Sequence, residues 1–254
     1  MSLPLDEQVV IVSGAGRGFG AAIAAAFARE GAKVAINYRI SRRPAEELAT
    51  RLGNDTRAFR ADIRSLDETK RLIEEVTAHF GAPTTVVHNA LSDFSFNGDA
   101  RPKLDELNWS DISAQLDTAV QGALNLIQAA RPSMAQAHFG RVVTIGTNLF
   151  QNPVVPYHDY TAAKAALLSL TRTAAAELGP LGITVNMVSG GLLRTTDASR
   201  ATPEAVFDLI AANTPLRRVT TPEEAADAVL FFASPWARAV TGQNLIVDGG
   251  LVFR

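Results

Sequence analysis

The feature of the sequence that most restricts the fold is a repeated alternation of short apolar runs with longer amphipathic stretches. The apolar runs are rich in β-branched residues and almost continuous, which is typical of strands buried on both faces of a sheet. The alternation therefore predicts βαβ units, a parallel sheet and helices on both of its faces. The predicted strands are Val9–Ser13, Val34–Tyr38, Thr84–Asn89, Arg141–Gly146, Thr184–Ser189 and Asn244–Val247, with Thr56–Arg60 as a weaker seventh; the predicted helices are Gly20–Glu30, Ala45–Leu52, Leu66–Phe80, Leu116–Ala130, Tyr160–Leu178 and Pro222–Ala233.

The chain is predicted to form one doubly wound, Rossmann-like domain over residues 1–254, with about seven strands. Its 254 residues suit one large domain, and no stretch rich in Gly, Pro or Ser divides them. Two stretches, Leu91–Asn108 and Gly190–Thr214, interrupt the alternation directly after predicted strands. Open α/β sheets bind ligands at the carboxyl ends of their strands. Both stretches are therefore candidate ligand-binding loops, with ordinary surface loops as the alternative.

The composition excludes several classes of function. The 24 Lys and Arg residues nearly balance the 26 Asp and Glu residues, so a nucleic acid partner is not expected. Cysteine is absent, which excludes disulfides, thiolate metal sites and cysteine nucleophiles. Without a long apolar run or a signal-like start, neither a membrane span nor secretion is expected, and a cytoplasmic location is predicted. The four histidines have no ligand spacing, so no metal site is predicted.

Glycines cluster where the first predicted strand meets the first predicted helix. Gly14, Gly18 and Gly20 fall in the segment Ser13-Gly14-Ala15-Gly16-Arg17-Gly18-Phe19-Gly20. Glycine allows the backbone to turn sharply and to approach a phosphate closely, and the helix N-terminus supplies free N–H groups and a positive dipole. At this strand-to-helix turn the pattern predicts a dinucleotide site, with a plain tight turn as the alternative.

The end of the second predicted strand indicates which dinucleotide is bound. It reads Asn37-Tyr38-Arg39 and lacks the acidic residue that would hold the ribose 2′-OH of NAD. Arginine instead suits the 2′-phosphate of NADP, because a guanidinium binds phosphate in a bidentate manner. We therefore predict NADP(H), with contacts from Arg17, Tyr38 and Arg39. A solvated basic surface is the alternative.

A tyrosine and a lysine four residues apart open one of the long helices. Tyr160 and Lys164 lie on the same helical face at this spacing. A free phenol has a pKa of about 10, and a nearby ammonium group favours its phenolate and lowers that pKa. Such a pair can act as a general acid and base between a carbonyl and an alcohol. Tyr157 is a competing tyrosine, but it lacks a lysine four residues later.

These two motifs together resemble the short-chain dehydrogenase/reductase family. The glycine spacing Gly-x-x-x-Gly-x-Gly follows Ser13, where the family has Thr, and the Tyr-x-x-x-Lys motif is intact. The resemblance runs from end to end and is nearest to the 3-oxoacyl-[acyl-carrier-protein] reductases. It implies an NADPH-dependent oxidoreductase of fatty acid biosynthesis, a small carbonyl substrate that could be bound to acyl carrier protein, and a homotetramer.

The resemblance also assigns roles to single residues. Thr147 stands where the family has the Ser that hydrogen-bonds the substrate carbonyl, and Asp62 stands where the family binds the adenine edge. The resemblance also places Tyr160 and Lys164 at the cofactor, with Lys164 holding the ribose. The further positions that it places around the cofactor are Ser13, Phe19, Ile63, Asn89, Ala90, Gly191 and Thr195.

Four positions depart from the family pattern. Leu91 replaces a Gly, Thr147 replaces the Ser, Gly190 replaces a Pro, and Ala119 replaces an Asn that helps to hold a water in a proton relay. These departures keep a second hypothesis open, a nucleotide-binding scaffold or sensor with weak or no turnover. The leading hypothesis is a carbonyl reductase, because Tyr160 and Lys164 are both present.

Overall fold

The computed structural model describes residues 2–53, 55–92, 94, 96 and 101–253. Seven strands in this part form one sheet in the order β3-β2-β1-β4-β5-β6-β7, and every neighbouring pair is parallel. The predicted fold class is therefore confirmed. The strands are β1 (Val9–Val12), β2 (Lys33–Tyr38), β3 (Thr56–Arg60), β4 (Thr85–His88), β5 (Gly140–Thr147), β6 (Ile183–Gly190) and β7 (Asn244–Val247).

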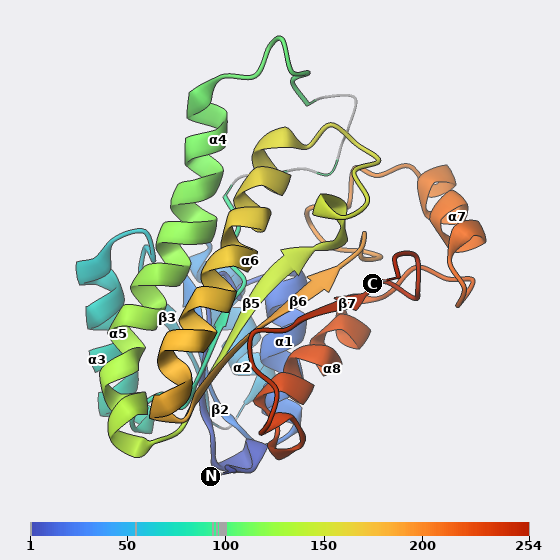
Figure 1. Cartoon of the computed structure of the whole chain (residues 1–254). Coiled ribbons are helices and arrows are strands. Elements are labelled where there is room, and N and C mark those ends of the chain that lie inside the picture. The colour runs from blue at the N-terminus through green and yellow to red at the C-terminus, as the bar shows by residue number, and fades with distance from the viewer. Residues whose placement is uncertain (1, 54, 93, 95, 97–100, 254) are drawn as a thin grey trace.

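Helices cover both faces of this sheet (Figure 1). One apolar core lies between the sheet and α1, α2 and α8, and a second lies between the sheet and α3, α5 and α6. The central strands β1, β4 and β5 are buried at every position, which explains their nearly continuous apolar sequences. The helices named so far are α1 (Gly18–Arg29), α2 (Arg42–Leu52), α3 (Leu66–Phe80), α5 (Gly122–Ala137), α6 (His158–Leu178) and α8 (Pro222–Ala233); short 3-10 turns are η1 (Leu5–Glu7), η4 (Asn148–Phe150), η5 (Gly179–Leu181) and η6 (Pro235–Ala237).

Two helices were not predicted from the sequence. The helix predicted at Leu116–Ala130 is a longer assembly: α4 (Trp109–Leu116), the π-helix η3 (Asp117–Gln121) and α5 follow one another without a break. Asn108 and Asp111 form a capping box that starts α4 where the predicted loop ends. Within the predicted loop Gly190–Thr214, helix α7 (Glu204–Asn213) forms after Pro203 and buries Phe207.

The direction of winding reverses between β1 and β4, which are neighbours in the sheet although β2 and β3 separate them in sequence. A crevice at the carboxyl ends of such strands is the usual ligand site of an open α/β sheet. The glycine turn, the loop after β3 and the end of β5 all meet this edge. Among the described residues, no helix combines the length and the apolar character needed to cross a membrane.

Candidate active site

The glycine turn packs tightly against the segment that follows β4. Gly14 and Gly18 have φ values of 63° and 56°, in the left-handed region that favours glycine. A Cβ on Gly14 would lie 2.8 Å from the Ala90 Cα. The Ser13 hydroxyl oxygen accepts hydrogen bonds from the backbone N–H groups of Asn89 and Ala90, both at 3.0 Å. The glycine turn and the Asn89–Ala90 segment, both predicted to bind the cofactor, are therefore held together by close packing and hydrogen bonds.

Gly20 allows an equally close contact inside α1. A Cβ there would lie 2.5 Å from Asn89 Nδ2 and 2.6 Å from the Gly14 carbonyl oxygen. Asn89 Nδ2 itself donates to the Ser13 and Gly14 carbonyl oxygens. The first turn of α1 contains no acidic side chain, so its free N–H groups and positive dipole face no carboxylate of their own helix. The residues present therefore fit a phosphate-bearing nucleotide.

Two predicted cofactor residues have buried side chains. Tyr38 is 8% exposed and packs in the core under α1 and α2, while its carbonyl oxygen accepts from the Ala61 N–H at 3.0 Å. Ile63 is 4% exposed, and its carbonyl oxygen accepts from Asn125 Nδ2 at 2.8 Å. Phe19 is partly buried against the first core. The side chains of Tyr38 and Ile63 mainly fix the fold around the crevice.

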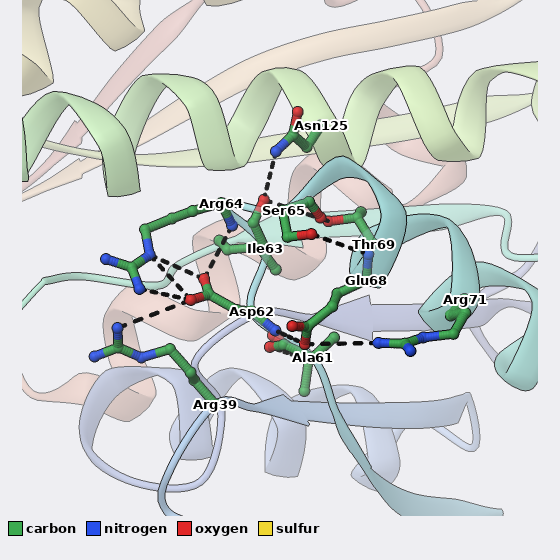
Figure 2. Close-up of polar contacts among 11 residues, drawn as sticks. Arg39, Ala61, Asp62, Ile63, Arg64, Ser65, Glu68, Thr69, Arg71 and Asn125 are labelled. Atoms are coloured by element: carbon green, nitrogen blue, oxygen red, sulfur yellow. Dashed lines mark hydrogen bonds and ion pairs between the residues drawn. The ribbon is translucent and has the colours of Figure 1, made fainter.

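The predicted charged contacts already have partners within the chain (Figure 2). Asp62 is held by both ends of the Arg64 guanidinium, with Oδ2 at 2.6 Å from Nη2 and Oδ1 at 3.0 Å from Nε. Arg39 Nη1 lies 3.9 Å from Asp62 Oδ2. Arg17 Nε lies 3.6 Å from a carboxylate oxygen of Asp197. The sequence analysis did not identify Arg64, although its position just after a strand end next to an acid was a usable signal.

Three polar side chains meet under the carboxyl end of β5. Thr147 ends this strand, and Tyr160 and Lys164 project from one face of α6; all three are at most 5% exposed. A hydrogen bond joins the Tyr160 and Thr147 side chains. Lys164 Nζ lies 5.7 Å from the Tyr160 ring centroid and donates to the Ile145 carbonyl oxygen at 2.7 Å. We call Thr147, Tyr160 and Lys164 the hydroxyl–ammonium cluster.

Burial controls the protonation of this cluster. It raises the pKa of Tyr160 to about 12, although the hydrogen bond with Thr147 acts in the opposite direction. The lowered phenol pKa expected from the sequence is therefore wrong for this structure, because the cost of burying the phenolate outweighs the effect of its neighbours. It lowers the pKa of Lys164 to about 8. At neutral pH the phenol therefore keeps its proton and the lysine is mostly charged. The cluster can therefore donate a proton from the Tyr160 hydroxyl, with the charged Lys164 Nζ 5.7 Å from the centre of the same ring.

Aromatic rings cover the cluster. Phe94 stacks on Tyr160 with 4.7 Å between ring centroids, and Phe96 meets both Tyr157 and Tyr160. The Arg101 guanidinium lies 4.3 Å from the Phe94 ring centroid and pairs with Asp159. The sequence left open whether Leu91–Phe96 lines a pocket or packs under a loop. Its described phenylalanines pack on the tyrosines, while residues 93 and 95 lie outside the described residues.

The Ala119 position lies in the π-helix η3 and is 2% exposed. The His88 ring faces the backbone of Thr118 and Ala119, and its Nδ1 lies 3.4 Å from the Ser13 hydroxyl. Burial, together with the charge of Lys164, lowers the pKa of His88 to about 3, so this ring is neutral at physiological pH. His88 was not selected from the sequence, because a lone histidine at a strand end has no distinctive pattern.

The loop after β6 contributes the last two predicted residues. Gly191 faces Asn148 and Asp248, whose side chains share a 2.8 Å hydrogen bond, and a Cβ on Gly191 would lie 3.1 Å from the Asp248 Cβ. Thr195 lines a hollow of about 320 Å³ together with Gly18. The predicted cofactor residues from β1, β4 and β6 therefore surround one edge of the sheet. The described residues contain no group of three or more His, Asp or Glu side chains placed to hold a metal ion.

Comparisons with known proteins agree with this geometry. A family model described as enoyl-(acyl carrier protein) reductase matches residues 14–252. The chain is 33% identical to the 3-oxoacyl-[acyl-carrier-protein] reductase FabG of Staphylococcus epidermidis over 96% of this chain and 99% of that protein. It is 32% identical to the corresponding reductase of a Synechocystis species over 98% of each.

A solved structure shows the same fold. A dehydrogenase/reductase from Sinorhizobium meliloti superposes with a TM-score of 0.85 at 30% identity, and the alignment covers 97% of this chain and 95% of that one. The residues matched by the family model include both the glycine turn from Gly14 onward and the hydroxyl–ammonium cluster. The chain therefore belongs to the short-chain dehydrogenase/reductase family of oxidoreductases.

Proposed function

We propose that this oxidoreductase is an NADPH-dependent carbonyl reductase whose proton donor is Tyr160. The observation that carries the proposal is the hydroxyl–ammonium cluster, in which two hydroxyl groups and a buried lysine meet at the ligand-binding edge of the sheet. Burying a lysine costs hydration free energy. A tyrosine with a purely structural role would not explain why that lysine is buried next to it.

Each member of the cluster has one task in the proposed reaction. Thr147 donates a hydrogen bond to the substrate carbonyl and holds it beside the phenol. Tyr160 gives its proton to the carbonyl oxygen, and the carbonyl carbon gains a hydride, so the product is an alcohol. The Lys164 charge stabilises the phenolate that remains. When bound, the nicotinamide of NADPH supplies the hydride.

The cofactor would be held by the glycine turn and by charged groups at its far end. The N-terminus of α1 after Gly14 and Gly18 suits the pyrophosphate. Arg17 and Arg39 suit the 2′-phosphate, and their side chains are 62% and 44% exposed, so a ligand can reach both. By their positions, Asp62 would contact the adenine edge, and Asn89 and Ala90 after β4 would contact the rest of the cofactor.

The proposed substrate is a 3-oxoacyl thioester. The named relatives are reductases of this substrate class. The aromatic rings of Phe94, Phe96 and Tyr157 and the partly buried Leu149 give the cluster an apolar surround that suits an acyl chain. We extend the proposal to a single domain over residues 1–254, a cytoplasmic location and a homotetramer, on the strength of the family likeness.

A substrate panel tests the proposal. Oxidation of NADPH is followed by absorbance with 3-oxoacyl thioesters, simple ketones and an enoyl thioester, the last because of the description of the matching family model. We expect turnover on the 3-oxoacyl thioesters and its loss in Tyr160→Phe. Turnover on the enoyl thioester alone would contradict carbonyl reduction. Tight NADPH binding without turnover on any substrate would favour the scaffold hypothesis.

A further inference from the structure

A charged cluster at the turn after β3 contains a residue that the proposed function does not use. Asp62 lies between two guanidinium groups, those of Arg39 from the end of β2 and Arg64 from its own turn (Figure 2). We call Arg39, Asp62 and Arg64 the Asp62 cluster. It lies at the carboxyl ends of β2 and β3, on the edge of the sheet that carries the glycine turn.

The two arginines approach Asp62 unequally. Arg64 makes a bidentate contact at 2.6–3.1 Å, and its backbone N–H donates to Oδ1 at 3.1 Å. Arg39 stays 3.9 Å from Oδ2 and forms no hydrogen bond there. The hydrogen bonds from Arg64 are the main reason that the pKa of Asp62 lies below its ordinary value, whereas the charge of Arg39 is the smallest contribution. Arg64 is therefore the dominant partner of this carboxylate.

The turn that presents Asp62 and Arg64 is fixed from several sides. The Asp62 N–H donates to Glu68 at 3.0 Å, and Ser65 caps the start of α3 by accepting from the Glu68 N–H at 3.3 Å. The Ile63 carbonyl oxygen between them accepts from Asn125 of α5 at 2.8 Å. Because the backbone is held on both sides of Ile63, the Arg64 guanidinium meets Asp62 without ordering a flexible loop.

The unequal approach decides which arginine remains available to a ligand. An ionised carboxylate attracts both guanidinium groups, and a bidentate arginine binds it better than a single distant contact. While Arg64 holds Asp62, the Arg39 guanidinium lacks a hydrogen-bonded carboxylate among the described residues and stays 44% exposed. The charge of Asp117 in η3 also attracts Arg64, which adds to its hold on this side of the turn.

We propose that Arg64 is a specificity-determining positioning residue for a 2′-phosphorylated adenosine: it occupies Asp62 and so leaves Arg39 free to bind the 2′-phosphate. This inference rests on the NADP preference in the proposed function. Arg64 acts through Asp62 and need not touch the phosphate. Without Arg64, the Arg39 guanidinium closes the remaining distance to Asp62 and is neutralised there, so the site loses its preference for the 2′-phosphate.

Binding of nucleotide fragments tests this coupling without any turnover. The probes are 2′,5′-ADP, which carries the 2′-phosphate, and 5′-AMP, which lacks it, each titrated calorimetrically into the full chain. We expect Arg64→Gln to weaken 2′,5′-ADP about three- to tenfold, as for a partly exposed charge pair, and to leave 5′-AMP within about twofold. The matched control is Arg71→Gln, because Arg71 lies on α3, which begins directly after this turn, is 63% exposed and pairs only distantly with Glu68.

A second background separates positioning from direct contact. In Asp62→Asn no carboxylate remains to capture Arg39, so adding Arg64→Gln should change 2′,5′-ADP affinity little. In Arg39→Gln the guanidinium that Arg64 is proposed to keep free is absent. Adding Arg64→Gln should therefore again change the affinity for 2′,5′-ADP little. A melting temperature of Arg64→Gln close to that of the unmodified chain shows that folding is intact.

Three results would overturn the inference. Equal weakening of both probes by Arg64→Gln would make Arg64 a general adenosine contact. A full effect that persists in Asp62→Asn would make it a direct phosphate ligand. No loss of 2′,5′-ADP affinity in a chain that prefers it over 5′-AMP would show that Arg39 needs no such help. If the unmodified chain shows no preference between the probes, the NADP part of the proposed function fails first.

Discussion

The two ends of the candidate site, the hydroxyl–ammonium cluster and the Asp62 cluster, both hold charged groups, but one is buried and the other is exposed. Members of the hydroxyl–ammonium cluster are 3–5% exposed, whereas side chains of the Asp62 cluster are 20–44% exposed. Burial makes each protonation state expensive and moves pKa values by about two units or more. Exposure leaves the charges screened and free to exchange partners. Under the proposed function, the buried end carries out the proton transfer and the exposed end selects the cofactor.

The largest expected effect is at the buried end. Tyr160→Phe removes the proposed proton donor and keeps the ring that stacks on Phe94. We expect kcat for a 3-oxoacyl thioester to fall about 10²- to 10⁴-fold, the usual contribution of a general acid. NADPH affinity, measured by fluorescence, should change little. Tyr157→Phe is the matched control. A similar fall in kcat in that variant would contradict the assignment of the proton donor to Tyr160.

Lys164 provides the next test, through stability instead of activity. Its pKa is lowered from 10.5 to about 8 by burial, so between these values the unfolded chain holds a proton that the folded chain lacks. Stability from this group therefore rises with pH across that window, by about 3 kcal/mol at 1.36 kcal/mol per pKa unit. Lys164→Met should remove this rise in chemical denaturation.

Lys70→Met is the control for that experiment, because Lys70 is an exposed lysine on α3. An identical pH dependence in the unmodified chain and in Lys164→Met would show that Lys164 is more hydrated than its burial implies. The contrast between the two ends of the site would then be much weaker.

The glycine turn, which lies between the two ends, is limited by space. Gly20→Ala would place a Cβ 2.5 Å from Asn89 Nδ2 and 2.6 Å from the Gly14 carbonyl oxygen. We expect a loss of about 1–3 kcal/mol in the free energy of unfolding, as for overpacking, together with weaker NADPH binding. In Gly179→Ala the added Cβ would meet no atom within 4 Å beyond its own stretch of chain, so stability should change by less than about 0.5 kcal/mol. Equal effects of both would contradict the close packing.

The smallest effect is expected at the exposed end. Changing Arg17 and Arg39 together to Ala should weaken NADPH about tenfold more than NADH, because only the former carries the 2′-phosphate. The difference should shrink as salt is added, in keeping with the exposure of both side chains. If both cofactors lose affinity equally, the two arginines do not read the phosphate.

Much of the fold could be predicted because its signals are local. β3, β7, α3 and α8 have the predicted bounds, and the other predicted strands differ by a residue or two at their ends. α7 escaped prediction because only Phe207 is buried on it, so it lacks the apolar stripe that marks the other helices. α4 escaped because its apolar residues are few and its start depends on a cap.

The candidate site was predictable only in part. Tyr160 and Lys164 share a helical face by their spacing, and the glycine turn follows a strand, so both motifs could be recognised from the sequence. The contacts around the site instead join distant segments, as in the pairs Arg17–Asp197, Arg101–Asp159 and Asn148–Asp248. No local pattern relates residues that are brought together by the winding of the sheet.

The sequence by itself determined the alternating architecture, the phosphate-binding turn and the presence of a tyrosine–lysine pair. Each of these is signalled by residues that lie close together in the sequence. Only the tertiary structure decided how deeply that pair is buried, and hence the direction of its pKa shifts. It also decided that Asp62 is held by hydrogen bonds from Arg64, with Arg39 at a longer distance. Burial and pairing are properties of the space between elements, and that space exists only once the sheet and its helices have packed together.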